Sequence, residues 1–155
     1  MSKEIILMLH PAFGVLGILA SVWVFAETLN VSATNTIRIR AAALLSAGFI
    51  WLAYIIGGYW YVVFYAADKA LIKAGPWPFA HSLVMESKEH LFLSLLLVAT
   101  LLPLAAFANL QVRKSARQLV YWSALTVIGL GLVMEGSGAI IGLGAKVALL
   151  AQQAG

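Results

Sequence analysis

Cysteine is absent from this chain of 155 residues. Its absence excludes disulfide bonds, iron–sulfur clusters held by thiolates and the covalent attachment of a c-type haem. A metal ion bound to this protein would therefore take nitrogen and oxygen ligands, which histidine and carboxylate side chains supply.

Charged residues are also scarce, at 10% of the chain against roughly 25% in soluble domains. Hydrophobic residues make up 63%, and the mean hydropathy is +0.96. Four apolar runs are each long enough for a helix to cross about 30 Å of hydrocarbon. The sequence therefore predicts a single all-α integral membrane domain over residues 1–155, folded as an antiparallel up-and-down four-helix transmembrane bundle. The expected spans are about 5–28, 39–66, 80–108 and 117–148.

The few basic residues fall unevenly on the two sides of these spans. One side holds Arg38, Arg40, Arg113, Lys114 and Arg117, and the other holds Lys3, Lys69, Lys73 and Lys146. The positive-inside rule makes the first side cytoplasmic, which places both termini on the outer side. We expect a multi-pass protein of the inner or plasma membrane of a prokaryote. The net charge of +4 is interpreted as a topology signal, without a nucleic-acid partner.

Motifs of soluble-type catalysis are missing from the sequence. It has no Walker loop, no dinucleotide-binding glycine fingerprint and no spacing that suggests a Ser–His–Asp arrangement. Four helices without an inverted repeat are also unlike a secondary carrier. Whether the protein is an enzyme stays open at this point.

One stretch, "HSLVMESKEH" at residues 81–90, concentrates ionisable groups in an otherwise apolar chain. A step of sixteen residues, roughly 24 Å along a helix, leads from the expected cytoplasmic edge of each span to one position on that span. The four positions are His10, Gly57, His90 and Glu135. We therefore expect them to lie in one layer in the outer part of the bilayer. An ionisable residue inside a span costs roughly 2.5–3.5 kcal/mol, so it usually faces the bundle interior and has a partner.

Helical spacing assigns a face to each of these groups. Residues at i, i+4 and i+7 share a face, and three such sets are His10 with Gly14, Gly17 and Ser21; Glu86 with His90 and Ser94; and Glu135 with Gly131, Gly138 and Gly142. The glycines have two interpretations. They let helices pack closely, or the space at Gly14 and Gly138 accommodates a flat ligand.

Three further features near this layer have a structural interpretation. Lys88 and Glu89 are placed where they can reach the headgroup region, and His81 is expected at the membrane interface. The aromatic segment "YWYVVFY", residues 59–65, is typical of the belt that anchors helices at an interface.

Two chemistries fit the predicted layer. In the first, His10 and His90 are the axial ligands of a b-type haem between the first and third helices, with Lys88 near its propionates. In the second, a non-haem site holds iron, manganese, zinc or another divalent metal. Its ligands are drawn from His10, His90, Glu86, Glu135 and Glu89.

The segment "LHPAFG", residues 9–14, resembles the start of the first helix in small four-helix membrane-bound b-type cytochromes and in uncharacterised membrane families grouped near them. The resemblance rests on Leu9, His10 and Pro11. It implies that His10 is an axial haem ligand and that a histidine of a later helix is the other. His90 is the best-placed candidate for that second ligand.

These observations predict a membrane electron-transfer protein that holds haem b near the outer face. One alternative is a non-haem metal-binding membrane protein or oxidoreductase, and another is an accessory subunit without a cofactor. The expected partners are the lipid bilayer, a quinone and a redox partner protein. Association into a homo-oligomer stays open.

Overall fold

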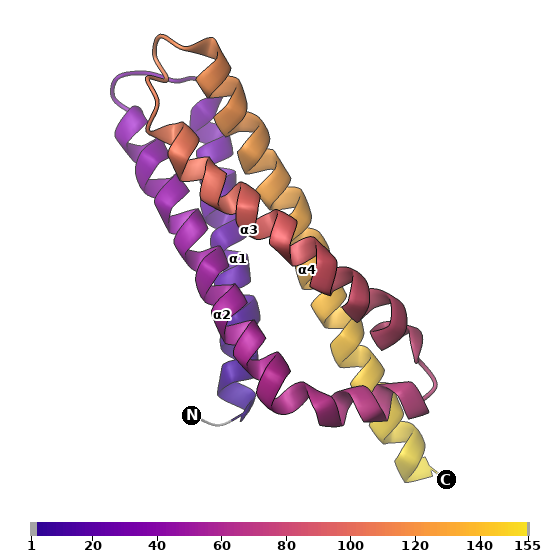
Figure 1. The fold of residues 1–155 in the computed structure, drawn as a ribbon. Coiled ribbons are helices and arrows are strands. Elements are labelled where there is room, and N and C mark those ends of the chain that lie inside the picture. Colours follow the sequence, from indigo (N-terminus) through magenta and orange to yellow (C-terminus); the bar gives the residue numbers. More distant parts are fainter. Residues whose placement is uncertain (1–2, 155) are drawn as a thin grey trace.

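Four long helices make up the computed structural model, which describes residues 3–154 (Figure 1). They are α1 (Lys3–Thr28), α2 (Thr36–Ala74), α3 (Glu86–Ala106) and α4 (Lys114–Ala154), and a short π-helix, η1 (Ala80–Met85), leads directly into α3. Each of the four, with η1 counted as part of the third, is long and apolar enough to cross a membrane. The all-α class and the four apolar helices are thus confirmed.

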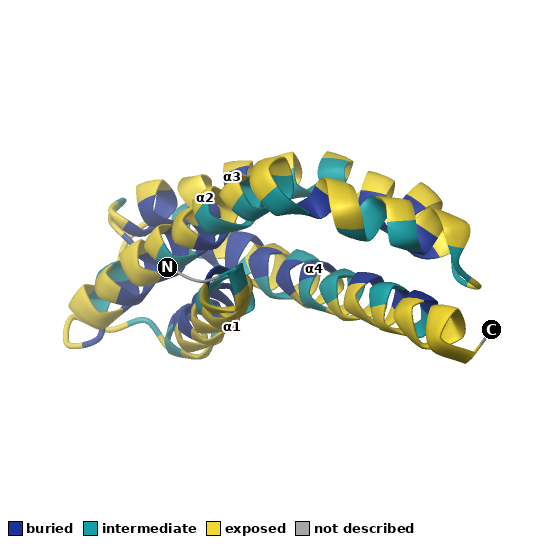
Figure 2. Ribbon diagram, turned by 90° about the horizontal axis from the view of Figure 1, so that it is seen from below, coloured by how far each residue is buried: buried dark blue, intermediate teal, exposed yellow. Residues whose placement is uncertain are grey.

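The helices run up and down, so that both chain ends and the turn between α2 and η1 lie toward one end of the molecule (Figure 1). Loops 29–35 and 107–113 lie at the opposite end, here called the loop end. The helices α2 and α3 lie side by side in one layer, and α1 and α4 lie in the other, with their buried faces turned inward (Figure 2). Within residues 3–154, α1 packs on α2 and α4 but not on α3. The helices α1 and α3 therefore occupy diagonally opposite corners.

Two helices are longer than the sequence predicts. Helix α2 has 39 residues and α4 has 41, which correspond to roughly 58 and 61 Å, about twice the thickness of the hydrocarbon core. The segment "ADKALIKA" (67–74), expected to begin a loop, continues α2 because alanine, leucine and lysine are good helix formers. The helix ends only at Gly75 and Pro76, where the proline ring disfavours further helix.

Helix α2 turns aside in its second half, so that its last turns cross the C-terminal part of α4 (Figure 1). Gly75 lies against Ala148 at this crossing. The pair Gly57–Gly58 sits near the middle of α2, and glycine pairs are a usual cause of helix bending. The bend gives the lower part of the molecule its own small core.

Three apolar clusters fill the interior from the loop end downward. The first surrounds Val24, Ala42 and Leu102, and the second surrounds Ile50, Leu95 and Val127. The third contains Tyr65, Ile72, Ala80, Met85 and Ile141. The expected layer lies along the helices between the second and third clusters, because positions 57, 90 and 135 fall between members of the two clusters on α2, on η1 and α3, and on α4.

Candidate functional site

His10 faces the interior of the bundle from α1. Its ring is half-buried, and Nδ1 lies 2.8 Å from the carbonyl oxygen of Ala53 on α2. The ring also packs on Gly57, where a Cβ atom would collide with the imidazole. His10 and Gly57, which the sequence places at one depth, are therefore in contact. The reason is steric, because only glycine leaves room for the ring.

Glu135 and Lys88 are each placed against a glycine of a neighbouring helix. The Glu135 carboxylate lies on Gly14 of α1, where a Cβ atom would collide with Oε1. The Lys88 ammonium lies over Gly138 of α4, 3.3 Å from the position that a Cβ atom would take. Both charged side chains are half-buried. Three ionisable groups from three helices thus occupy space that three glycines provide.

These three groups interact electrostatically. Lys88 acts on both Glu135 and His10, although α3 and α1 do not pack on each other. No direct ion pair forms between Lys88 and Glu135, and within residues 3–154 neither side chain hydrogen-bonds to another protein group. The Lys88 protons and the Glu135 oxygens therefore remain available to water or to a ligand. We call His10, Lys88 and Glu135 the polar layer.

His90 has a different environment from the one that the sequence predicts. It is exposed, and its Nδ1 lies 2.6 Å from the carbonyl oxygen of Glu86 one turn earlier in the same helix. Glu86 and Ser94 are also exposed, so the predicted shared face exists but turns outward. Because residues two positions apart differ by about 200° around a helix, Lys88 facing inward requires His90 to face outward.

Side chains of the protein fill the space beside the two glycines that were expected to accommodate a flat ligand. Gly14 accommodates Glu135 and Gly138 accommodates Lys88, so neither borders an open slot for a flat ligand. His10 faces the bundle interior, whereas the other predicted axial ligand, His90, is exposed on α3.

Among residues 3–154, carboxylates and histidines do not gather into a metal site. In the part of the chain that the structure describes, no three of these side chains come together in a way that could hold a metal ion. Glu86 and His90 instead line a shallow hollow of about 460 Å³ on the outer face of η1 and α3, together with Ser82, Leu83, Ser87 and Leu91. The non-haem alternative gains no support from this arrangement.

A second group of polar side chains lies next to the layer, toward the turn between α2 and η1. Tyr65 and His81 are 2% and 3% exposed, and the Tyr65 hydroxyl lies 3.1 Å from Nδ1 of His81. The Tyr61 hydroxyl lies close to the Glu89 carboxylate and interacts with it electrostatically. The rings of Tyr61 and Tyr65 stack with centroids 5.2 Å apart. We call Tyr61, Tyr65, His81 and Glu89 the tyrosine cluster.

Two residues of this cluster are turned away from lipid. His81 is buried among protein side chains, and Tyr65 points into the protein and so cannot contribute to an aromatic belt. The cause is the π-helix, in which the Glu86 N–H donates to the His81 carbonyl and His81 turns toward α2. A π-turn has no clear sequence signature, but such turns are frequent at functional sites.

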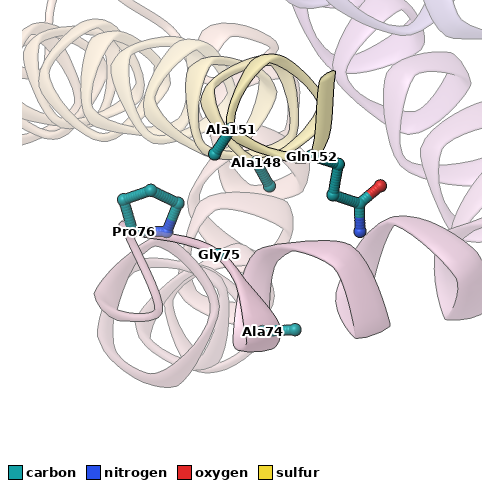
Figure 3. A pocket seen from close by; sticks show the side chains of 6 residues that line it. All are labelled: Ala74, Gly75, Pro76, Ala148, Ala151 and Gln152. Carbon is teal, nitrogen blue, oxygen red and sulfur yellow. The ribbon is translucent and has the colours of Figure 1, made fainter. Parts of the chain in front are cut away.

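A further hollow, of about 430 Å³, lies where the end of α2 meets the end of α4 (Figure 3). Its lining consists of Ala74, Gly75, Pro76, Ala148, Ala151 and Gln152. Only Gln152, whose amide points from α4 toward α2, offers a polar side chain there (Figure 3). This lining provides no ionisable group for chemistry.

Comparison with known proteins adds no relative: no family model, curated protein or solved structure matches this chain. The resemblance of residues 9–14 to b-type cytochromes accordingly stays a prediction. The polar layer and the tyrosine cluster are the features of the described chain that bear on its function.

Proposed function

We propose that this protein is a multi-pass membrane protein whose polar layer takes up and releases protons inside the bilayer. The observation that carries the proposal is the placement of Lys88 and Glu135. Both are held inside the bundle, attract each other, and still form no direct ion pair. Ionisable residues in such positions commonly mark proton or substrate pathways.

A purely structural role explains this arrangement less well. A polar contact that only fastens helices gains most from direct hydrogen bonds, which Lys88 and Glu135 lack. Apolar residues of similar volume often stabilise a core as well as a buried ion pair does. With smaller apolar residues in place of Glu135 and Lys88, alanine would also fit at Gly14 and Gly138, so a purely structural contact would not require these glycines. The layer is therefore better explained by a use for its exchangeable protons.

Each member of the layer has a distinct part in the proposal. Glu135 binds and releases the proton, while the Lys88 ammonium stabilises its ionised form by Coulomb attraction. His10 of α1 interacts electrostatically with Lys88, and its Nδ1 contact with Ala53 fixes the orientation of the ring. Helix α2 brings no charged side chain into the layer; it supplies the Ala53 carbonyl and the space at Gly57.

Infrared spectroscopy of the purified protein in lipid tests this proposal. As the pH is changed, we expect the carboxyl C=O band of Glu135 to appear and disappear, and Glu135→Gln to remove that signal. Glu86→Gln is the matched control, because Glu86 is an exposed carboxylate outside the layer. A Glu135 signal that is absent or does not change with pH overturns the proposal.

Haem-based electron transfer is a second candidate function, favoured by one observation on His10. A histidine that binds a metal usually gives its other ring nitrogen to a backbone carbonyl, as Nδ1 of His10 does with Ala53. His10 is thus oriented for ligation through Nε2. The electron-transfer proposal keeps a quinone and a redox protein as its partners.

An absorption spectrum of the detergent-purified protein, with metal analysis of the same sample, tests the haem proposal. A Soret band that His10→Ala abolishes supports it. The effect of His90→Ala then decides whether this exposed histidine is the second ligand. A parent protein without a Soret band rules out haem and leaves the proton-exchange proposal standing.

A further inference from the structure

We propose that the tyrosine cluster is the proton path between the polar layer and the aqueous side at the turn between α2 and η1. This inference rests on the proposed function, because a path matters only if the layer exchanges protons. The path runs through His81, Tyr65, Tyr61 and Glu89. It ends beside Lys88, the chain neighbour of Glu89.

The geometry at the inner end of the path comes from α3. Lys88 and Glu89 are consecutive, so their side chains leave the helix about 100° apart. Lys88 lies against Gly138 of α4, whereas Glu89 contacts Tyr61 of α2. The same turn of α3 thus presents Lys88 to the polar layer and Glu89 to the tyrosine cluster.

The middle of the path joins two buried groups, Tyr65 and His81, to two half-buried ones, Tyr61 and Glu89. The Tyr65 hydroxyl hydrogen-bonds with Nδ1 of His81, and the Tyr65 ring stacks on Tyr61. Tyr61 in turn interacts electrostatically with Tyr65 and with the Glu89 carboxylate. Phenol, imidazole and carboxylate groups all exchange protons with a hydrogen-bonded neighbour. Each group that gives a proton on one side receives one on the other, so no net oxidation or reduction occurs along the path.

The outer end of the path opens toward charged residues. His81 interacts electrostatically with Lys69 and Lys73 of α2 and with Glu86 and Glu89 of α3. Lys73, in the last turn of α2, and Glu86 are exposed, whereas Lys69 and Glu89 are half-buried. His81 therefore joins the buried hydroxyl of Tyr65 to the polar surface of the molecule.

The chain offers matched variants for a test of the path. Tyr65→Phe removes one buried hydroxyl and keeps the ring, and His81→Gln removes the imidazole. Tyr59→Phe is the control, because Tyr59 lies on the same helix but is 53% exposed. Glu89→Gln tests the inner end of the path.

The measurement is the rate at which the infrared carboxyl signal of Glu135 responds to a pH jump, with the full-length protein in lipid. We expect Tyr65→Phe, His81→Gln and Glu89→Gln to slow the response roughly a hundredfold, the low end for a positioned proton-transfer group. The Tyr59→Phe control should respond at the parent rate. An unchanged final amplitude in Tyr65→Phe would show that the layer itself stays intact.

The outcomes separate the path from the proposed function. Equal rates in the parent, Tyr65→Phe and His81→Gln overturn the path and leave proton exchange at Glu135 standing. A parent protein whose Glu135 signal does not respond to pH overturns both. Slowing in Tyr59→Phe equal to that in Tyr65→Phe also overturns the path, because an exposed hydroxyl outside the cluster would then matter as much.

Discussion

Glu135 of α4 rests directly on Gly14 of α1, and a single added methyl group at position 14 would occupy the place of its carboxylate oxygen. This contact fixes the depth at which α1 and α4 meet. It places a half-buried acid of α4 against a buried glycine of α1.

Gly14→Ala should displace the Glu135 side chain and destabilise the protein by about 1–3 kcal/mol, the usual cost of overpacking a close contact. Thermal unfolding in detergent measures the effect. Gly48→Ala is the control, since a Cβ atom at Gly48 meets nothing within 4 Å. If Gly14→Ala and Gly48→Ala unfold at the same temperature, the contact between Glu135 and Gly14 is not formed as described.

Lys88→Met and Glu135→Gln should not have additive effects on stability. Each single variant removes one member of an interacting pair, whereas the double variant leaves no unpaired charge behind. A double-mutant cycle on unfolding free energies should give a coupling of about 0.5–3 kcal/mol, as expected for neighbouring groups. Additive effects would mean that the two charges do not sense each other.

Gly57→Ala should push the His10 ring away from α2 and break its contact with Ala53. The neighbouring Gly58→Ala is a close control, because a Cβ atom there has open space. Nitrogen NMR of labelled His10 reports the hydrogen bond at Nδ1. We expect its chemical shift to move in Gly57→Ala only, and a matching shift in Gly58→Ala would contradict the placement of the ring.

Asn35→Ala should destabilise the connection between α1 and α2 by about 1–3 kcal/mol, because it leaves backbone carbonyls without a donor. The Asn35 amide donates to the carbonyl oxygens of Glu27 and Asn30, at 3.1 and 3.0 Å, and to the Glu27 carboxylate at 2.9 Å. Thr34→Ala, at an exposed neighbour, should have a smaller effect. Unfolding free energies of the two variants compare them directly.

Part of the candidate site could be predicted from the sequence because depth along a helix depends only on residue count. The sixteen-residue steps placed His10 level with Gly57, and the two are in contact. The steps also placed Glu135 in the same layer, where it lies one turn from His10, on Gly14. The inward face of α1 was equally visible, since His10, Gly14 and Ser21 share it.

The sequence by itself determined four apolar helices, their up-and-down order and the level of the polar layer, because chain length and hydropathy act locally. The tertiary structure alone decided which side of α3 faces inward. A helix with apolar residues on every side gives no periodic signal for its buried face. Packing against Gly138 and Tyr61 turned Lys88 and Glu89 inward and His90 outward, and the π-helix turned His81 toward Tyr65.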